Sequence, residues 1–310
     1  INSEVVSIDR EAKVVKVRMS DGREYDESYD KLLLSPGALP VRPPLPGIDS
    51  EGIFTLRNVS DTDRIKGYIR SRRIERAVIV GGGFIGLEMA ENLHHAGAEV
   101  SVVEMAPQVM APIDFSMASF VHQHLQQKGV QLYLEEAVES FEKSGKGLRV
   151  KFKSGSTLET DIVILSIGVR ANTSLAQQAG LELGSMKGIL VNEYLQTSDE
   201  NIYAVGDAIE FPHPLTGKSW LNFLAGPANR QARIVADNMV FGNSVKYEGS
   251  IGTSVAKVFD MTVASTGLPA KRLKQMDIPY LSATIHSGSH AGYYPGSLQM
   301  SIKITFSPKD

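Results

Sequence analysis

A GxGxxG pattern of glycines stands where a short apolar stretch gives way to a helical one. The glycines are Gly81, Gly83 and Gly86, and they follow the apolar residues 77–80. At this spacing the first glycine permits a tight turn, the second lets the backbone approach a pyrophosphate without a Cβ in between, and the third lets the helix pack closely on the strand. The helix start then offers free N–H groups and a partial positive charge to phosphates. The pattern predicts a dinucleotide-binding turn.

Glu104 provides the acidic residue that completes this pattern. It follows the apolar residues 100–103 and lies 18 positions after Gly86. A carboxylate at the end of this second strand would accept hydrogen bonds from a ribose diol and would repel a 2′-phosphate, so NADH is the expected coenzyme, with NADPH possible. A glycine-rich turn without a ligand is the alternative. The strand, the helix and the distal acid together argue against it.

Around these residues the sequence predicts a Rossmann-like α/β fold. Residues 77–80, the glycine turn, a helix ending near residue 97 and residues 100–103 form a βαβ unit, because two apolar strand patterns flank a helical one. Further elements are expected in this order: a helix at 61–73, a helix at about 116–127, a strand at 130–134, and paired strands at 148–152 and 162–167.

Strand-rich sequence stands on both sides of this unit. Before it, we expect a β-meander and a Pro- and Gly-rich crossover. The meander consists of expected strands at 4–8, 13–19 and 29–35, with a turn at Asp21-Gly22, and the crossover covers residues 36–47. After it, strand-like sequence begins at residue 188, a helix is expected at about 226–241, and an antiparallel sheet follows from 249. This order predicts that the dinucleotide-binding domain is inserted between two parts of another domain.

Composition excludes several classes of function. The 310 residues carry a net charge of −3 and no Lys/Arg run longer than Arg72-Arg73, so nucleic acid is not an expected partner. No apolar run approaches the roughly 20 residues of a membrane span, and the start lacks a signal-peptide pattern, so the cytoplasm is the expected location. The sequence contains no cysteine, and its seven histidines lack metal-ligand spacing. Neither a thiol nucleophile nor a metal site is expected in these residues.

A second pattern lies at residues 197–208, TSDENIYAVGDA, where an apolar strand ends in Gly206-Asp207. The periodicity alone is typical of any strand that ends in a turn. The whole string resembles the second flavin motif of the FAD-dependent pyridine nucleotide-disulfide oxidoreductases, in the branch of the CoA-disulfide reductases and NADH oxidases. Residues 35–47 resemble that family's crossover into its NAD domain.

The resemblance extends to the return crossover and to a later helix. Residues 166–172 include Gly168 and resemble the return crossover, with Ala171 where the family usually has proline. Residues 224–231 include Ala225 and resemble the start of the helix that points at the flavin, with Ala232 just beyond them in place of a commoner glycine. Matches that run in the same order from end to end are more specific than any single motif.

The resemblance implies a division into domains and a set of cofactors. A Rossmann-like NAD(H)-binding domain at 61–185 would be inserted between two parts of an FAD-binding domain, at 1–60 and 186–248. Part of an α+β dimerisation domain would follow at 249–310. The implied cofactors are FAD and NADH.

Roles for single residues also follow from the resemblance. Asp207 would bind a ribityl hydroxyl of FAD, and the helix from Ala225 would stabilise negative charge on reduced flavin. Phe84 would gate the nicotinamide pocket, although core packing is an equal alternative. Glu88 would lie beside the flavin, with a solvated helix face as its equal alternative. The expected cofactor-binding residues are Gly81, Gly83, Phe84, Ile85, Gly86, Glu104, Gly168, Gly206, Asp207 and Ala225.

Two adjacent tyrosines narrow the resemblance to one branch. Tyr293 and Tyr294 stand directly before Pro295-Gly296. This arrangement resembles that of the CoA-disulfide reductases, in which a tyrosine hydroxyl from one subunit reaches the active site of the other. Its hydroxyl could bind the substrate or polarise the sulfur leaving group. Tyr293, Tyr294 and Glu88 are the expected catalytic residues. A packed aromatic strand end in a dimer interface is the alternative for the tyrosines.

Members of this family carry two features that these residues lack: a first strand-turn-helix for the ADP half of FAD, and a redox-active cysteine. The sequence is therefore interpreted as an internal portion of a longer protein. That parent is expected to be a homodimer that passes hydride from NADH through FAD to a small CoA-derived disulfide. The 310 residues alone are expected to bind NADH and to reduce no disulfide. An NADH oxidase or peroxidase of the same superfamily, and a non-catalytic NAD-binding redox module, remain as alternatives.

Overall fold

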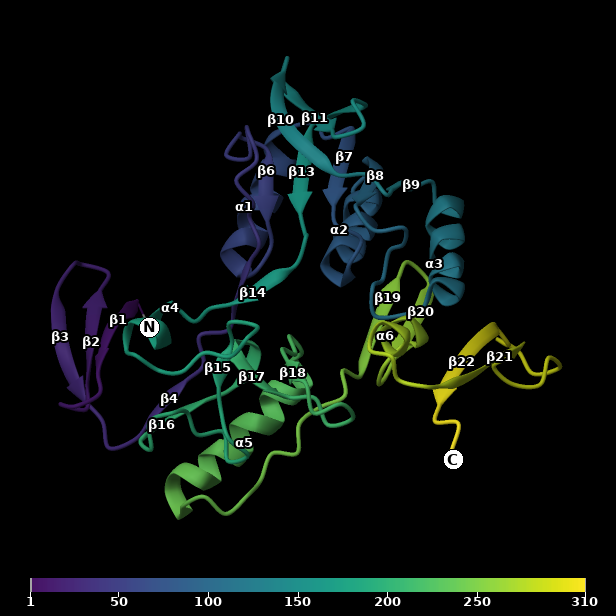
Figure 1. Cartoon of the computed structure of the whole chain (residues 1–310). Helices are drawn as coiled ribbons and strands as arrows, with labels where there is room; N and C mark the ends of the chain where they lie inside the picture. The colour runs from purple at the N-terminus through teal and green to yellow at the C-terminus, as the bar shows by residue number, and fades with distance from the viewer. Residues whose placement is uncertain (1, 310) are drawn as a thin grey trace. The chain divides into compact units, whose positions relative to one another are not determined.

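The fold was analysed in a computed structural model, which describes residues 2–309 (Figure 1). Contacts within the chain divide it into two units. Unit 1 consists of Ile1–Leu39 and Val169–Thr253, and unit 2 of Pro40–Gly168 and Ser254–Asp310. Each unit has a core of its own and is described by itself. The four-part domain assignment made from the sequence stays a prediction.

A five-stranded parallel sheet forms the centre of unit 2 (Figure 1). Its order is β6-β13-β7-β8-β9, with bounds Ile53–Thr55, Ile162–Leu165, Arg76–Val80, Glu99–Glu104 and Gln131–Leu134. All neighbouring pairs run parallel. Strands β7 and β8 join through helix α2 (Phe84–His95), so the βαβ unit expected from the sequence is confirmed.

Both faces of this sheet are covered, because side chains alternate between the two faces of a strand. Ile79 and Val102 point to one face, where helix α2 contributes Leu87 and helix α3 (Phe115–Gln127) contributes Leu125. Helix α1 (Val59–Ser71) lies on the same face and begins with a capping box between Asn58 and Asp61. The opposite face packs on an antiparallel sheet of β10 (Val138–Ser144), β11 (Gly147–Phe152) and β12 (Thr157–Thr160).

The expected pairing of residues 148–152 with 162–167 is wrong. Strand β11 pairs with β10 and β12, whereas β13 lies between β6 and β7 in the parallel sheet. All four residues of β13, Ile162 to Leu165, are buried. A continuous apolar run of this kind is typical of a central parallel strand, which is covered on both faces.

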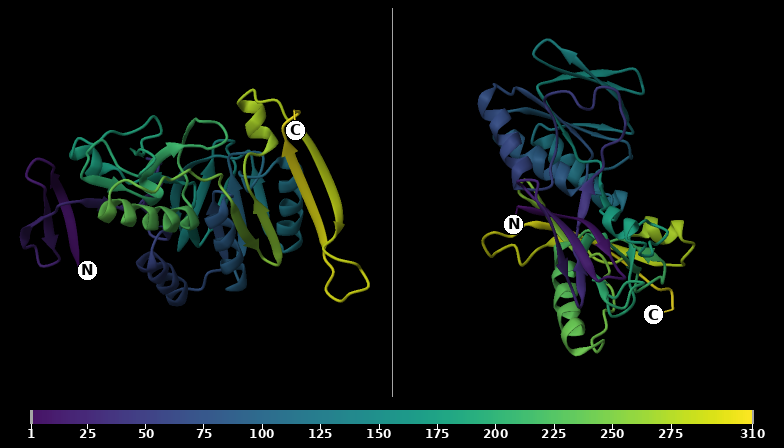
Figure 2. Two further views of the ribbon diagram at one scale, coloured as in Figure 1. Left: turned by 90° about the horizontal axis from the view of Figure 1, so that it is seen from below. Right: turned by 90° about the vertical axis from the view of Figure 1, so that its left-hand side faces the viewer.

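The C-terminal segment of unit 2 consists of two antiparallel hairpins and a short helix. The elements are β19 (Ser254–Val258), β20 (Met261–Ser265), α6 (Ala270–Gln275), β21 (Leu281–Gly288) and β22 (Gln299–Phe306). Figure 2 shows β21 and β22 as a long hairpin, coloured yellow. Val258 and Phe259 join the core beneath helix α2. The antiparallel character expected from residue 249 onward is confirmed, and α6 is an addition.

Unit 1 begins with the β-meander β1 (Ser3–Asp9), β2 (Val14–Met19) and β3 (Glu24–Ser28). The turn at Asp21-Gly22 is confirmed, but the third strand is not the expected 29–35. Instead, β4 (Leu32–Leu34) pairs in parallel with β16 (Ile202–Ala204). The residues of β3 are all exposed and mostly polar, so they carry no apolar alternation that sequence reasoning could detect.

The rest of unit 1 combines short strands with one long helix. The pairs are β5 (Ala38–Pro40) with β14 (Val169–Ala171), and β17 (Ile209–Pro212) with β15 (Ile189–Leu190) and β18 (Ser219–Trp220). Helix α4 (Ser174–Gln178) is short, and helix α5 (Ala225–Phe241) has 17 residues. No helix within residues 2–309 is both long and apolar enough to cross a membrane.

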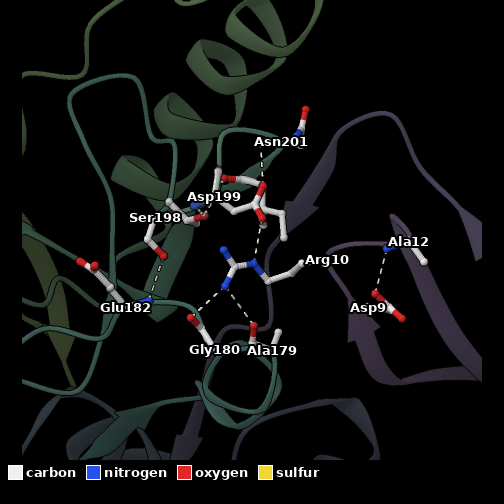
Figure 3. A network of polar contacts seen from close by, with 11 residues as sticks. Asp9, Arg10, Ala12, Ala179, Gly180, Glu182, Ser198, Asp199 and Asn201 are labelled. Carbon is white, nitrogen blue, oxygen red and sulfur yellow. Dashed lines mark hydrogen bonds and ion pairs between the residues drawn. The ribbon is translucent and has the colours of Figure 1, made fainter.

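Arg10 ties the β1–β2 turn to two later segments of unit 1 (Figure 3). Its Nε donates to Oδ2 of Asp199 at 2.8 Å, and one terminal nitrogen donates to the carbonyl of Gly180 at 3.0 Å. The other oxygen of Asp199 accepts the N–H of Asn201. Burial acts to raise the pKa of Asp199, but the hydrogen bonds from Arg10 and Asn201 outweigh it and hold that pKa below its usual value. This network fixes the loop that leads into β16.

Candidate functional site

Two glycines at the junction of β7 and α2 are required by close backbone packing. Gly81 has φ +108°, and a Cβ on it would lie 2.4 Å from the carbonyl oxygen of Ser166. A Cβ on Gly86 would lie 2.0 Å from the carbonyl oxygen of Gly81. Both positions therefore exclude a side chain, and helix α2 packs directly against the turn that precedes it.

Gly83 differs, because a Cβ there would meet no atom within 4 Å. It is the N-cap of α2, and no side chain caps the helix. The space beside Gly83 is open, and the first-turn N–H groups of the helix have no side-chain acceptor. An open cradle of backbone amides at the positive end of a helix fits a pyrophosphate.

Glu104 lies at the end of β8, directly beside this turn. Its Oε2 accepts the N–H of Gly82 at 2.7 Å, and its Oε1 accepts the N–H of Ala106 at 2.8 Å. Each carboxylate oxygen has further acceptor capacity, so a ribose diol could bind as well. The structure thus brings together the glycine turn and the acid that the sequence predicted.

Sequence reasoning missed three residues that shape this turn. A Cβ on Gly82, between the first two glycines of the fingerprint, would lie 2.6 Å from Cγ1 of Val109, so this position also disfavours a side chain. The hydroxyl of Ser166 lies within hydrogen-bond distance of the carbonyls of Val80 and Gly81, at 3.1 and 3.0 Å. Ser166 and Val109 are far from the turn in sequence, and no local pattern indicates that they contact it.

Three other predicted residues lie on the first turns of α2. Phe84 is half-buried and packs against the core, which agrees with its packing alternative. Ile85 is exposed, and so is Glu88. The structure therefore places Ile85 and Glu88 on the accessible side of the helix start, where a ligand could reach them.

The predicted flavin residues meet in unit 1. Buried strand β16 leads into a single 3-10 turn, Gly206–Ala208, which contains Asp207. This turn packs on α5, whose first residue is Ala225. A Cβ on Gly206 would lie 3.8 Å from Cβ of Ala228. The N-cap residue of α5, Leu224, makes no side-chain capping hydrogen bond, and a helix N-terminus packed on the turn of Asp207 fits an anionic or hydroxyl-rich ligand.

Gln231 ends the stretch 224–231 that resembles the family, but sequence reasoning assigned it no role of its own. It is buried, and its Oε1 accepts the N–H of Gly206 at 2.7 Å. Its Nε2 donates to the hydroxyl of Tyr247 at 3.0 Å. Gly206 has φ +78°, so this amide fixes the left-handed residue that precedes Asp207.

The remaining predicted residues are Gly168, Tyr293 and Tyr294. Gly168 has φ +106°, and its carbonyl accepts the N–H of Val41. Tyr293 and Tyr294 lie in the loop of the β21–β22 hairpin and are 83% and 60% exposed. Their ring centroids are 4.8 Å apart at 37°. Within residues 2–309, no group of three His, Cys, Asp or Glu could hold a metal ion.

Comparison with known proteins assigns this arrangement to a family. The profile described as pyridine nucleotide-disulphide oxidoreductase matches residues 1–226. The NADH oxidase of Methanocaldococcus jannaschii is 35% identical over 303 residues, which are 97% of this chain and 67% of that protein. The coenzyme A disulfide reductase of Staphylococcus haemolyticus is 33% identical over 304 residues, 98% of this chain and 67% of that protein.

A solved structure supports the same assignment. The crystal structure of reduced Bacillus anthracis CoADR-RHD is 50% identical, with a TM-score of 0.95 over 98% of this chain. The match covers 55% of that Bacillus chain, so the present chain spans little more than half of its length. With the flavin and dinucleotide elements in the family's order and fold, the chain belongs to the pyridine nucleotide-disulphide oxidoreductases, a family of flavin-dependent enzymes that use NAD(P)H.

Proposed function

We propose that this chain provides the NADH site and part of the FAD site of a flavoprotein that reduces a small CoA-type disulfide. The observation that carries the proposal is the open backbone cradle at Gly83, with Glu104 beside it. Relatives named coenzyme A disulfide reductase, and the Tyr293-Tyr294 pair, support the substrate class. The start of α2 with Glu104 would hold NADH, which would supply a hydride, and Asp207 with the start of α5 would hold part of the FAD that would accept its two electrons.

The residues of this chain bind and orient; they do not carry the sulfur chemistry. The amides at the start of α2 hold the pyrophosphate, and Glu104 accepts hydrogen bonds from the adenosine ribose. In unit 1, Asp207 binds a ribityl hydroxyl, and the N-terminus of α5 stabilises negative charge near the flavin pyrimidine. We expect the chain to bind NADH through these residues. Because it contains no cysteine, we expect it to reduce no disulfide alone.

The coenzyme assignment is tested at Glu104. Calorimetric titration of NADH and NADPH against the wild-type chain, Glu104→Gln and Glu104→Ala gives six affinities. Glu104→Gln keeps one oxygen acceptor and removes the charge, so it should narrow the preference for NADH over NADPH. Glu104→Ala removes both backbone contacts as well and should weaken NADH binding by roughly tenfold. Equal NADH/NADPH ratios in all three proteins would refute the assignment to Glu104.

A second candidate is an NADH oxidase, which the Methanocaldococcus jannaschii relative favours by its name. The two activities differ in their electron acceptor. Steady-state turnover of the full-length parent with CoA disulfide and with oxygen separates them. Oxygen turnover that exceeds disulfide turnover by orders of magnitude would favour the oxidase.

We also propose that the parent is a homodimer that associates through the β21–β22 hairpin. Directly paired residues of this hairpin place one row of side chains on a common face. The row is Leu281, Ala283, Ile285, Ser287, Met300, Ile302, Ile304 and Phe306. All but one are apolar, and most are exposed. An exposed apolar face of this kind marks an interaction surface.

A further inference from the structure

His122 lies on helix α3, outside the predicted site, yet its ring contacts the loop that covers the glycine turn. Its Nε2 accepts the backbone N–H of Val109 at 3.1 Å. The ring is half-buried, and Phe115 presents an edge to it, with ring centroids 5.9 Å apart. Nothing in the proposed binding of NADH uses this imidazole.

The loop held by His122 fixes Gly82, which lies between the first two glycines of the fingerprint. Val109 is fully buried and lies against Gly82, where a Cβ would come within 2.6 Å of Cγ1. The next residue, Met110, donates its N–H to the carbonyl of Gly82 at 2.9 Å. Glu104 accepts the N–H of Gly82, and the loop donates to its carbonyl, so the backbone of Gly82 is held on both sides. A movement of Val109 would therefore disturb the amides that cradle the pyrophosphate.

We propose that His122 is a positioning residue for the dinucleotide, and that only its neutral imidazole holds the Val109 loop in the binding conformation. This inference rests on the proposed NADH site. It adds a dependence of nucleotide affinity on the protonation of a side chain that does not touch the nucleotide.

The chemistry of the contact gives the direction of this dependence. A backbone N–H can only donate, so Nε2 of His122 must keep its lone pair and the neutral ring carries its proton on Nδ1. Protonation turns Nε2 into a second donor facing the Val109 N–H, and the contact must break. Burial lowers the pKa of His122 below its ordinary value of 6.5, so the neutral form persists at neutral pH and is lost only in acid.

Other titratable groups lie on α3 and on the elements that contact it. They are Asp114, His124, Lys128, Tyr133, Asp260, Lys271, His286 and Lys303. Asp114 is paired with Lys303, and His124 with Asp260. The set contains two further imidazoles, so the test needs a variant that removes the proton-binding site of His122 alone.

His122→Gln supplies that variant, since an amide oxygen can accept the same N–H and does not titrate. His122→Ala removes the acceptor. The matched control is His95→Gln, which replaces an exposed imidazole on α2 of the same unit. The probe is ADP-ribose, titrated by calorimetry into each full chain between about pH 8 and pH 5. Denaturant unfolding at both pH values shows that each variant remains folded.

At pH 8 we expect His122→Gln and the wild type to bind ADP-ribose with equal affinity. Between pH 8 and pH 5 the affinity of the wild type should fall by roughly fivefold more than the affinity of His122→Gln. His122→Ala should be about fivefold weaker at pH 8, with little further loss from this contact in acid. His95→Gln should follow the wild type. Identical pH profiles for wild type and His122→Gln would overturn the inference.

Failure of the NADH site itself gives a different result. Wild-type chain that binds no ADP-ribose at any pH refutes both the proposed function and the inference built on it. Binding at pH 8 with a profile that His122→Gln leaves unchanged refutes the inference alone. Amide hydrogen exchange at Val109 gives a second readout, since the protection of this amide relative to its intrinsic exchange rate should fall in acid in the wild type and not in His122→Gln.

Discussion

Gly83 and Gly86 lie three residues apart in one fingerprint, yet a side chain would meet different surroundings at each. At Gly86 a Cβ would collide with the backbone of Gly81, and at Gly83 it would enter open space. One glycine is therefore required by the fold, whereas the other is required only if something approaches the backbone there. This difference separates a ligand-binding turn from a merely tight one.

The pair gives a test of the site that is independent of catalysis. Gly83→Ala should change the free energy of unfolding by less than about 1 kcal/mol, because its φ of −80° suits alanine. It should nevertheless lower NADH affinity, because the new methyl group stands where the pyrophosphate would approach. Gly86→Ala should cost about 1 to 3 kcal/mol through overpacking. Denaturant unfolding and calorimetric titration measure both, and unchanged NADH affinity in a folded Gly83→Ala would contradict the site.

The sequence specified the glycines and Glu104 but not the residues that hold them. GxGxxG spacing and a distal acid are local patterns, so they could be predicted. Ser166 lies 85 residues from Gly81, and Gln231 lies 25 residues from Gly206. Their roles depend on contacts made only in the folded chain, so no spacing in the sequence marks them. The same is true of His122 and Val109.

At the scale of elements, the start of helix α3 joins the parallel-sheet part of unit 2 to its C-terminal segment. Asp114 is the N-cap of α3, but its carboxylate accepts the N–H groups of Ala270 and Lys271 at the start of α6. The same carboxylate pairs with Lys303 on β22 at 2.8 Å. A single buried acid thus connects three elements.

Asp114→Ala should lower the stability of unit 2 by about 2 to 4 kcal/mol, because it leaves two N–H groups and a lysine without their acceptor. The exposed pair Lys16–Asp26 provides the control, and Asp26→Ala should cost less than about 1 kcal/mol. Urea unfolding measures both changes. Equal effects for the two variants would show that the Asp114 contacts do not stabilise the unit.

The same carboxylate sets the direction of a pH dependence. Burial acts to raise the pKa of Asp114, but hydrogen bonds from Lys303, Lys271 and Ala270 outweigh it and hold that pKa below its usual 3.8. A group whose pKa is lower in the folded state binds fewer protons there, so folding is favoured as pH rises. Its contribution is therefore complete above pH 3.8 and is lost as pH falls through the lower folded value. The acid sensitivity of unfolding below pH 3.8 should be weaker in Asp114→Asn.

Elements were easiest to predict where burial leaves a pattern on one strand or helix. Helices α2, α3 and α5 carry apolar faces and were expected to within a few residues. Strand β13 was expected, but its partner was not, because a run buried on both faces does not say which neighbours cover it. Strand β3 left no pattern at all, since every residue is exposed.

At the scale of the whole molecule, the β21–β22 hairpin is turned opposite to the usual orientation of a surface sheet. Its polar side contacts the rest of unit 2: Lys303 pairs with Asp114, Thr305 donates to the carbonyl of Leu268, and His286 lies against Phe120. The apolar face defined above is left exposed. Alternation in the sequence predicted the strands but could not say which face would be covered, because the answer depends on a surface outside the unit.

If that face binds a second copy, the chain should self-associate. Ile285 and Ile304 are 53% and 55% exposed and lie near the middle of the face. The double variant Ile285→Lys/Ile304→Lys adds two like charges to each copy, so association should weaken by roughly a hundredfold or more. Sedimentation equilibrium measures this change. Ser156→Lys/Thr157→Lys is the matched control, because it adds the same two charges at exposed residues away from the hairpin, and it should associate like the wild type. NADH affinity should be equal in all three proteins, because the glycine turn is not altered. A wild-type chain that stays monomeric at high concentration would place the dimer contact elsewhere and leave the nucleotide site unaffected.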